Sequence, residues 1–246
     1  MLVRSLHSPF EKIGVGVHSG RPAKVSVRPG PPGFRFHRDG VVVPALVDFV
    51  IDTSMSTSLG RDGVRIGMVE HLLSALWGLG VEGADIQVEG SELPILDGSA
   101  APWVDRLLDH STAREVTGPA RSLVVTLSAR EGLDALGPRT VSFDLENGDY
   151  AAEIGWARTF VHAGDVERLL ADGRGAGATA ENTLVVGDPG GPPVVRGPSE
   201  PTRHKLLDAL GDLALLGRPH RGTIRLVDSG HTSHVDLVRG LASQRS

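Results

Sequence analysis

Residues 201–212, PTRHKLLDALGD, place His204, Asp208 and Asp212 four residues apart. On an α-helix such residues lie along one face, while the leucines between them lie on the opposite side. A proline at the start suits the first helical turn, where its missing N–H is not needed. A polar stripe of this kind is usually a solvated helix face. Three titratable side chains on one stripe also suit a binding site, so a second fragment must decide between the two interpretations.

The composition limits the class of protein. The chain has 246 residues, of which 40% are hydrophobic and 22% charged, as in a soluble globular protein of one large domain or two small ones. A formal net charge of −5 argues against a general nucleic-acid or membrane-surface binder. There is no cysteine, which excludes disulfides and thiolate metal sites. Any transition metal must therefore be held by His, Asp or Glu.

The chain lacks the apolar segments that direct proteins to membranes. Its N-terminal stretch, MLVRSLHSPFEKIGVG, has no long apolar core and is not expected to be a signal peptide. No run approaches the 18 or so apolar residues of a membrane span. We therefore expect a cytoplasmic protein with no stable membrane insertion and no nucleic-acid partner, and we expect a monomer.

The first half of the sequence predicts strands followed by two helices. Short apolar runs between Gly and Pro turns predict strands over residues 24–30, 33–40, 41–52 and 84–90. Apolar positions at helical spacing predict a helix over residues 68–80, with Gly78 and Gly80 near its end. A second helix is expected over residues 97–110, capped by Ser99.

The second half repeats this plan after a polar stretch. Strands are expected over residues 122–129, 139–146, 150–160, 181–188 and 222–231, and helices over residues 163–173, from Pro201 onward and at the C-terminus. The polar residues suggest a linker at 113–121, which divides the chain into domains of residues 1–112 and 122–246. Neither half alternates strands and helices regularly, so we predict the α+β class, with helices layered on sheets.

The second fragment, VEHLLSAL, places Glu70 directly before His71. Adjacent helical residues point about 100° apart, so they do not touch but can flank a common point. A catalytic metal uses such a pair, with the imidazole on the ion and the carboxylate beside it as a base. The H-E-x-x-H pattern is absent, because no second His follows four residues later. If the two helices meet, His204 and Asp208 complete a three-ligand set that suits zinc and leaves a position for water.

Seven motifs in order resemble one enzyme family. They are GVGVHSG, VEHLLSALWGLG, LPILDGSAAPWV, RTF, ENTLVV, RHKLLDALGDLALLG and SGH. Together they are similar to the zinc-dependent UDP-3-O-acyl-N-acetylglucosamine deacetylases of lipid A synthesis in Gram-negative bacteria. The resemblance runs from about Gly14 to His231. It implies two domains of similar fold, each a small β-sheet with two helices, with the helices sandwiched between the sheets and the active site at the domain junction.

The resemblance also implies the roles of individual residues. One Zn²⁺ ion, with Fe²⁺ as the alternative, is expected on His71, His204 and Asp208. Glu70 is expected to be the general base. The remaining catalytic groups are expected to be His231, which stabilises the oxyanion and protonates the leaving amine, Asp212, which accepts a hydrogen bond from His231, and Thr159, which helps to hold the oxyanion.

The implied substrate is a UDP-linked acylated amino sugar, from which the enzyme releases acetate. Phe160 is expected to pack near the sugar and Lys205 to reach the phosphates. Two alternatives stay open: a catalytically silent relative that binds a nucleotide sugar or an acyl group, and a zinc deacetylase of another N-acetylated sugar. The short second domain motivates the first alternative, and two departures from the family bear on substrate affinity and chain-length preference. Residues 130–159 form a short segment, and residues 161–173 differ where the acyl passage is expected.

Other motifs favour structural roles. GVGVHSG lacks the third glycine of a dinucleotide-binding loop, so we expect a turn leading into a strand. An ordinary hydrogen-bonded turn histidine is the favoured interpretation of His18, and an approach to the pocket is the alternative. Asp97 is expected to be structural. The remaining histidines have no paired ligand spacing, and solvated or packing roles are expected for them: His7, His37, His110, His162, His220 and His234.

Overall fold

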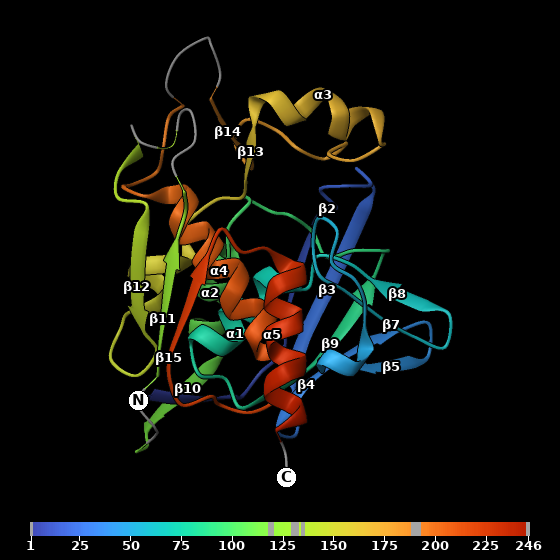
Figure 1. The fold of residues 1–246 in the computed structure, drawn as a ribbon. Helices are drawn as coiled ribbons and strands as arrows, with labels where there is room; N and C mark the ends of the chain where they lie inside the picture. The colour runs from blue at the N-terminus through green and yellow to red at the C-terminus, as the bar shows by residue number, and fades with distance from the viewer. Residues whose placement is uncertain (1, 118–120, 129–132, 134–135, 188–192, 245–246) are drawn as a thin grey trace.

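Two main sheets face each other across a layer of helices in the computed structural model (Figure 1). It describes residues 2–117, 121–128, 133, 136–187 and 193–244. The N-terminal sheet and the C-terminal sheet flank helices α1, α2, α4 and α5. The expected α+β class, with helices between two sheets, is confirmed.

The N-terminal sheet has five strands in the order β2-β3-β9-β4-β5. Their bounds are β2 (Phe10–Val15), β3 (Pro22–Pro29), β9 (Gly83–Glu89), β4 (Gly33–Arg38) and β5 (Val41–Pro44). All pairs are antiparallel except β4 with β9. Buried and exposed residues alternate along part of β9, as expected for a sheet with one face on the core. A turn joins β2 to β3, as the GVGVHSG motif predicts.

Smaller elements complete the first half. A three-stranded sheet follows β5, in the order β6-β7-β8, after the 3-10 turn Val47–Phe49. Its strands are β6 (Val50–Asp52), β7 (Ser58–Arg61) and β8 (Val64–Ile66). The two expected helices are α1 (Glu70–Gly78) and α2 (Ala101–Asp109). Ser99 lies before α2, and its Oγ accepts a hydrogen bond from the N–H of Ala101 at 3.1 Å.

The C-terminal sheet has three strands in the order β12-β11-β15. They are β12 (Thr140–Asp144), β11 (Arg121–Thr126) and β15 (Gly222–Val227), with β11 parallel to β15. A separate unit pairs β13 (Phe160–His162) with β14 (Leu184–Val186) in parallel, and α3 (Ala163–Ala171) connects them. Two further helices follow β14: α4 (Glu200–Ala214) and α5 (His231–Ser243).

Helices α1 and α4 pack closely because a glycine lies between them. A Cβ added to Gly211 of α4 would lie 2.1 Å from the carbonyl oxygen of Glu70, the first residue of α1. Only glycine permits this approach. Leucines of both helices, including Leu72 and Leu207, are fully buried in one apolar core that also takes residues from both main sheets. The common core fixes the two helices relative to each other.

Two expectations about local structure are wrong. Residues 150–160 do not form a strand, because Ala151–Gly155 is a π-helical turn and β13 begins only at Phe160. The Asp149 side chain accepts the N–H of Ala152, and buried Tyr150 bonds Ser74 through its hydroxyl at 2.7 Å. These contacts, together with two adjacent alanines, favour a helical turn over extended chain.

The expected linker at 113–121 begins inside a strand. β10 (Ser111–Glu115) pairs along its length with β1 (Leu2–Leu6), in antiparallel register. Most side chains of β10 are exposed, so its sequence lacks the apolar alternation that signals a strand. Residues 118–120 lie outside the described residues.

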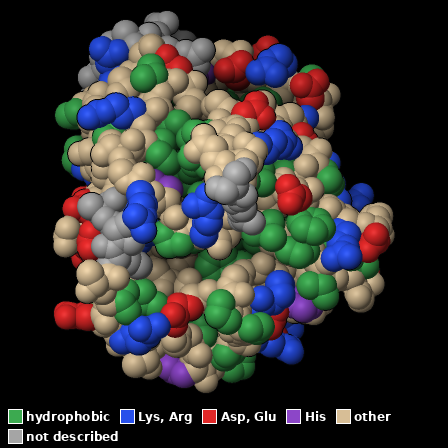
Figure 2. Space-filling model, turned by 60° about the horizontal axis from the view of Figure 1, so that its bottom comes forward, with side chains coloured by type: hydrophobic (Ala, Val, Ile, Leu, Met, Phe, Trp, Pro, Cys, Tyr) green, Lys and Arg blue, Asp and Glu red, His purple; other side chains and the backbone are tan. Residues whose placement is uncertain are grey.

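The surface agrees with the modest net charge. On the face drawn in Figure 2, basic and acidic side chains are interspersed with apolar ones. Within the described part of the chain, no helix is both long enough and apolar enough to cross a lipid bilayer.

Candidate active site

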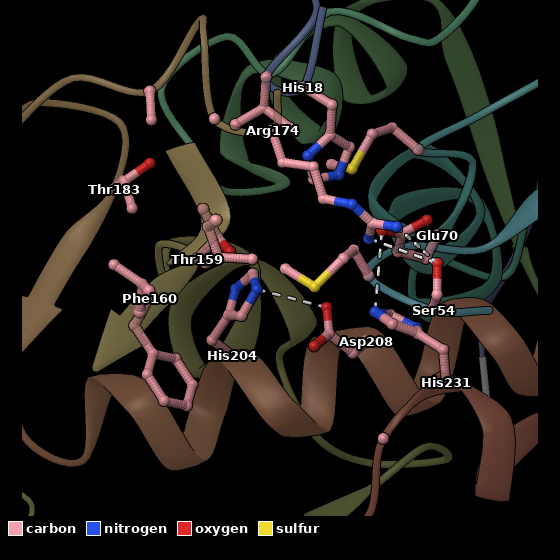
Figure 3. A pocket seen from close by; sticks show the side chains of 18 of the residues that line it. His18, Ser54, Glu70, Thr159, Phe160, Arg174, Thr183, His204, Asp208 and His231 are labelled. Atoms are coloured by element: carbon pink, nitrogen blue, oxygen red, sulfur yellow. Dashed lines mark hydrogen bonds and ion pairs between the residues drawn. The ribbon is translucent and has the colours of Figure 1, made fainter. Parts of the chain in front are cut away.

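The site is a pocket at the junction of the two halves, with a volume of about 620 Å³ (Figure 3). Helix α1 contributes its first two residues, and α4 and α5 contribute their N-terminal parts. β13 and the turn before it form another wall. Eight of the nine predicted site residues line this pocket: Glu70, His71, Thr159, Phe160, His204, Lys205, Asp208 and His231. The ninth, Asp212, lies beneath His231 and is fully buried.

Three side chains from α1 and α4 converge at the buried end of the pocket. The Nε2 atoms of His71 and His204 lie 3.8 Å and 3.3 Å from Oδ1 of Asp208. All three residues are at most 5% exposed. Ligand atoms bound at about 2.0–2.1 Å to a tetrahedral ion are roughly 3.3–3.4 Å apart, so the observed spacing fits a metal ion of this kind.

The hydrogen bonds of His204 and Asp208 leave the atoms that face each other free to bind a metal ion. Nδ1 of His204 lies 3.0 Å from the carbonyl oxygen of Ala157, which can only accept, so Nδ1 carries the proton and Nε2 presents its lone pair. The second oxygen of Asp208 accepts a hydrogen bond from Nζ of Lys205 at 2.9 Å. A metal-binding imidazole requires this pattern, in which the outer nitrogen is held by the protein.

Burial and charge put these groups in the protonation states that a cation needs. Burial lowers the pKa of His71 to about 3, with His204 acting in the same direction. Burial also lowers the pKa of His204. For Asp208, burial acts to raise the pKa, but the favourable interactions of its carboxylate with His204 and with the ammonium of Lys205 hold it well below its ordinary value. Two neutral imidazoles and one carboxylate are therefore present near pH 7.

Glu70 and His231 lie together beside this group. The N–H of Thr57 donates to Oε2 of Glu70 at 3.0 Å, and Nε2 of His231 lies 3.9 Å from Oε1. Burial raises the pKa of Glu70 to about 8, although His231 acts in the opposite direction. Burial lowers the pKa of His231, but Asp212 more than offsets this and raises it to about 9. Below pH 8 both groups therefore carry a proton, so His231 is a proton donor and Glu70 becomes a proton acceptor only once it is ionised.

A second buried group lies one turn further along α4. Asp212 accepts hydrogen bonds through Oδ2 from Nδ1 of His231 and Nδ1 of His234, each at 2.8 Å. Its other oxygen accepts a hydrogen bond from the hydroxyl of Thr57. The expectation of a solvated or merely packing His234 misses this bond, because the pairing with α4 is not visible in the spacing along α5.

The remaining wall of the pocket is mainly apolar. It is formed by α3, by β13 and by segments of the first half that face them: Val17, Met55, Met68, Ile95, Val161, Val166, Leu169 and Leu170. None of the residues of α3 is buried, which leaves its apolar side chains facing the pocket or solvent. Phe160 stands at the other side, where its ring lies 5.7 Å from Nζ of Lys205.

His18 lines the pocket, which is the less favoured of its two sequence-based interpretations. Both of its ring nitrogens are buried and lack a hydrogen-bond partner among the described residues, and the ring lines the pocket. Its hydrogen bonds come from the backbone: its N–H donates to Glu92 at 3.4 Å, and its carbonyl oxygen accepts from the N–H of Ala176 at 3.4 Å. The expectation of an ordinary hydrogen-bonded turn histidine is therefore wrong for the side chain. Asp97, by contrast, is structural as expected, since it accepts hydrogen bonds from Ser99 and Arg196.

Comparisons with known proteins agree with this geometry. The sequence profile of the family described as UDP-3-O-acyl N-acetylglycosamine deacetylase matches residues 3–130 and 108–243. A protein of Myxococcus xanthus named UDP-3-O-acyl-N-acetylglucosamine deacetylase is 40% identical, over 95% of this chain and 84% of its own length. Proteins of the same name from Anaeromyxobacter dehalogenans and Nautilia profundicola are 39% and 31% identical, over 92% and 100% of this chain and 82% and 94% of their own lengths.

Proposed function

The chain belongs to the UDP-3-O-acyl-N-acetylglucosamine deacetylase family, and on that premise we propose that it hydrolyses the acetamide of UDP-3-O-acyl-N-acetylglucosamine. The products are acetate and the free amine, and the reaction belongs to lipid A biosynthesis. The observation that carries the proposal is the convergence of His71, His204 and Asp208, with Glu70 and His231 beside them. The expected cytoplasmic location and monomeric state stay predictions.

We assign one zinc ion to His71, His204 and Asp208. The donor set supports this choice, because two neutral imidazoles and a carboxylate with an open fourth position are typical of catalytic zinc. When bound, zinc supplies Lewis acidity and lowers the pKa of water to about 7. The same donors also accept Fe²⁺, so the metal content of the purified protein decides the ion.

The chain's own residues then cover the proton transfers. Amide hydrolysis needs a base for the attacking water, stabilisation of the tetrahedral oxygen and a proton for the leaving amine. Glu70 takes the proton of the water, since a nearby cation favours its ionised form. His231, kept cationic by Asp212, donates from Nε2 to the developing oxyanion and then to the amine. Thr159 lines the same pocket and adds a hydroxyl donor at the oxyanion.

The two sides of the pocket suit the two ends of the substrate. Phe160 offers a ring for the sugar, and the ammonium of Lys205 beside it offers charge for the phosphates. Asp208 raises the pKa of Lys205 above its ordinary value despite burial, so Lys205 stays charged. The apolar side chains of α3 provide a surface for the acyl chain. Part of the shortened segment between Arg130 and Thr159 lies outside the described residues.

The decisive experiment measures acetate release from UDP-3-O-acyl-N-acetylglucosamine, with and without a chelator. Wild-type protein is expected to turn over and to lose activity when the ion is removed. Glu70→Gln is expected to keep the ion and the KM but to lose about 10²- to 10⁴-fold in kcat, because only the base is removed. Tight substrate binding without any acetate release would instead indicate a catalytically silent relative. If the protein deacetylated only a different N-acetylated sugar, the proposed substrate would be wrong and the proposed reaction would stand.

A further inference from the structure

His234 is a polar side chain in a buried position of α5, where an apolar side chain could fill the same space. It follows His231 by three residues on α5, so both rings leave the helix on the same side. Its side chain is fully buried. Yet both of its ring nitrogens are bonded: Nδ1 to Oδ2 of Asp212 at 2.8 Å, and Nε2 to Oγ of Ser229 at 2.8 Å. Polar atoms this well paired in a core indicate a specified arrangement rather than space filling.

The protonation of the group follows from its geometry. An ionised carboxylate can only accept hydrogen bonds, so the two Nδ1 atoms that lie 2.8 Å from one oxygen of Asp212 both carry protons. His231 is then left with Nε2 directed at Glu70, at 3.9 Å from Oε1. The hydroxyl of Ser229 can donate or accept, so it suits His234 in either charge state.

The distances within the group of Asp212, His231 and His234 show that it is not a metal site. Asp212, His231 and His234 are close enough together to be considered as ligands. However, nitrogen–oxygen distances of 2.8 Å are those of hydrogen bonds, shorter than the roughly 3.3 Å between two ligands of one tetrahedral ion. Protons, not a cation, therefore lie between these three side chains.

Each oxygen of Asp212 is held by donors from other parts of the chain. The hydroxyl of Thr57 donates to Oδ1, and the two imidazoles of α5 donate to Oδ2. If His234 were absent, Oδ2 would keep one donor, and the carboxylate could rotate about its χ2 bond, which has a broad energy minimum. Rotation would move the acceptor away from Nδ1 of His231 and change the direction of its Nε2–H.

We propose that His234 is a positioning residue for His231: by donating Nδ1–H to Oδ2 of Asp212, it fixes the carboxylate that orients the His231 ring toward the reacting atoms. This inference rests on the proposed function, since it takes His231 to be the proton donor of the deacetylation. His234 itself is not among the residues that line the pocket, so we place it outside contact with the substrate.

The test compares three variants in full-length, metal-loaded protein. His234→Leu removes both hydrogen bonds. His234→Asn keeps a donor, because Nδ2 of asparagine is attached to Cγ as Nδ1 of histidine is. Ser229→Ala removes only the outer hydrogen bond. We expect His234→Leu to lower kcat by roughly 10- to 100-fold, as loss of such supporting partners does, with KM and metal content within about twofold of wild type. His234→Asn is expected to recover most of the loss.

A matched control separates positioning from stability. Val238→Ala also truncates a fully buried side chain of α5 but removes no polar contact. It is expected to lower the melting temperature and leave kcat within about twofold. An unchanged kcat in His234→Leu would overturn the proposal. So would a loss in His234→Asn as large as that in His234→Leu, or a loss in Ser229→Ala that equals it.

A second readout does not depend on the deacetylase activity. The Nδ1–H proton of His231, bonded to Asp212, gives an NMR resonance that reports the geometry of this hydrogen bond. His234→Leu is expected to shift this resonance and His234→Asn to leave it near its wild-type position. An unmoved resonance in His234→Leu would overturn the positioning role. Absence of acetate release by the wild type would instead contradict the proposed function, while the NMR result would still decide the inference.

Discussion

Two successive turns of α4 carry two buried aspartates, each facing two imidazoles, and the distances differ. Around Asp208, the Nε2 atoms of His71 and His204 lie 3.8 Å and 3.3 Å from one carboxylate oxygen. Around Asp212, two Nδ1 atoms lie 2.8 Å from one oxygen. The first spacing leaves room for an ion between the side chains, and the second holds protons. On the proposed assignment, one helix supplies a metal-binding turn at Asp208 and a proton-holding turn at Asp212, about 6 Å apart along the axis of a standard helix.

The largest effect is expected from the metal-binding turn. Asp208→Ala removes one of three ligands, so the protein should lose its ion on dialysis and its activity should fall on the order of 10³-fold or more. Metal analysis of the dialysed protein and acetate release measure the two effects. Retention of a full equivalent of zinc in this variant would break the comparison, because Asp208 would then not be a ligand.

The proton-holding turn is expected to give a smaller loss with the ion in place. Asp212→Asn should keep the metal and lower kcat on the order of 10²-fold, because His231 loses its charged partner. Asp212 raises the pKa of His231 to about 9, so His231 is cationic below that pH and loses its charge as the pH rises through it. In wild type the rate should therefore fall above about pH 9. In Asp212→Asn the fall should begin at lower pH.

The pH–rate profile of Asp212→Asn, measured beside that of the wild type, checks this direction. If the rate of Asp212→Asn fell at the same high pH as that of the wild type, a group other than His231 would be responsible for the fall. Loss of zinc from this variant would show that the two turns of α4 are not separate in function.

The smallest expected effect is on the number of protons that the protein releases when it binds zinc. Without an ion, burial raises the pKa of Glu70 to about 8, so Glu70 is mostly protonated at pH 7. A cation beside it favours the carboxylate, so ionisation of Glu70 should contribute about one proton to the release on zinc binding at pH 7. His71 and His204 should add none, because burial has already made them neutral. Calorimetry in buffers of different ionisation enthalpy measures the release.

Glu70→Gln is the control for this count and should release about one proton less than the wild type. At pH values well above 8 the difference between the two proteins should shrink, because Glu70 is then ionised before the metal binds. Equal proton release from both proteins at pH 7 would assign the proton to another group.

The periodicity of apolar residues along the sequence predicted most of the helices and strands. The clearest cases are helices α1 and α4, whose apolar faces are visible in the sequence. The turn at Ala151–Gly155 and the strand β10 were not predicted, because a buried tyrosine stabilises the first and pairing with β1 stabilises the second. Neither contact leaves a periodic signal in its own segment.

What the sequence determined by itself was the set of residues that share a helix face: His204, Asp208 and Asp212 on one stripe, and Glu70 beside His71. The geometry of a single helix suffices for that, since 3.6 residues per turn place such positions in any fold. Only the tertiary structure decided which stripes meet. Gly211 lets α1 approach α4, and α5 brings two imidazoles onto Asp212. These contacts join segments far apart in the chain, and packing of a common core, which no local pattern encodes, brings them together.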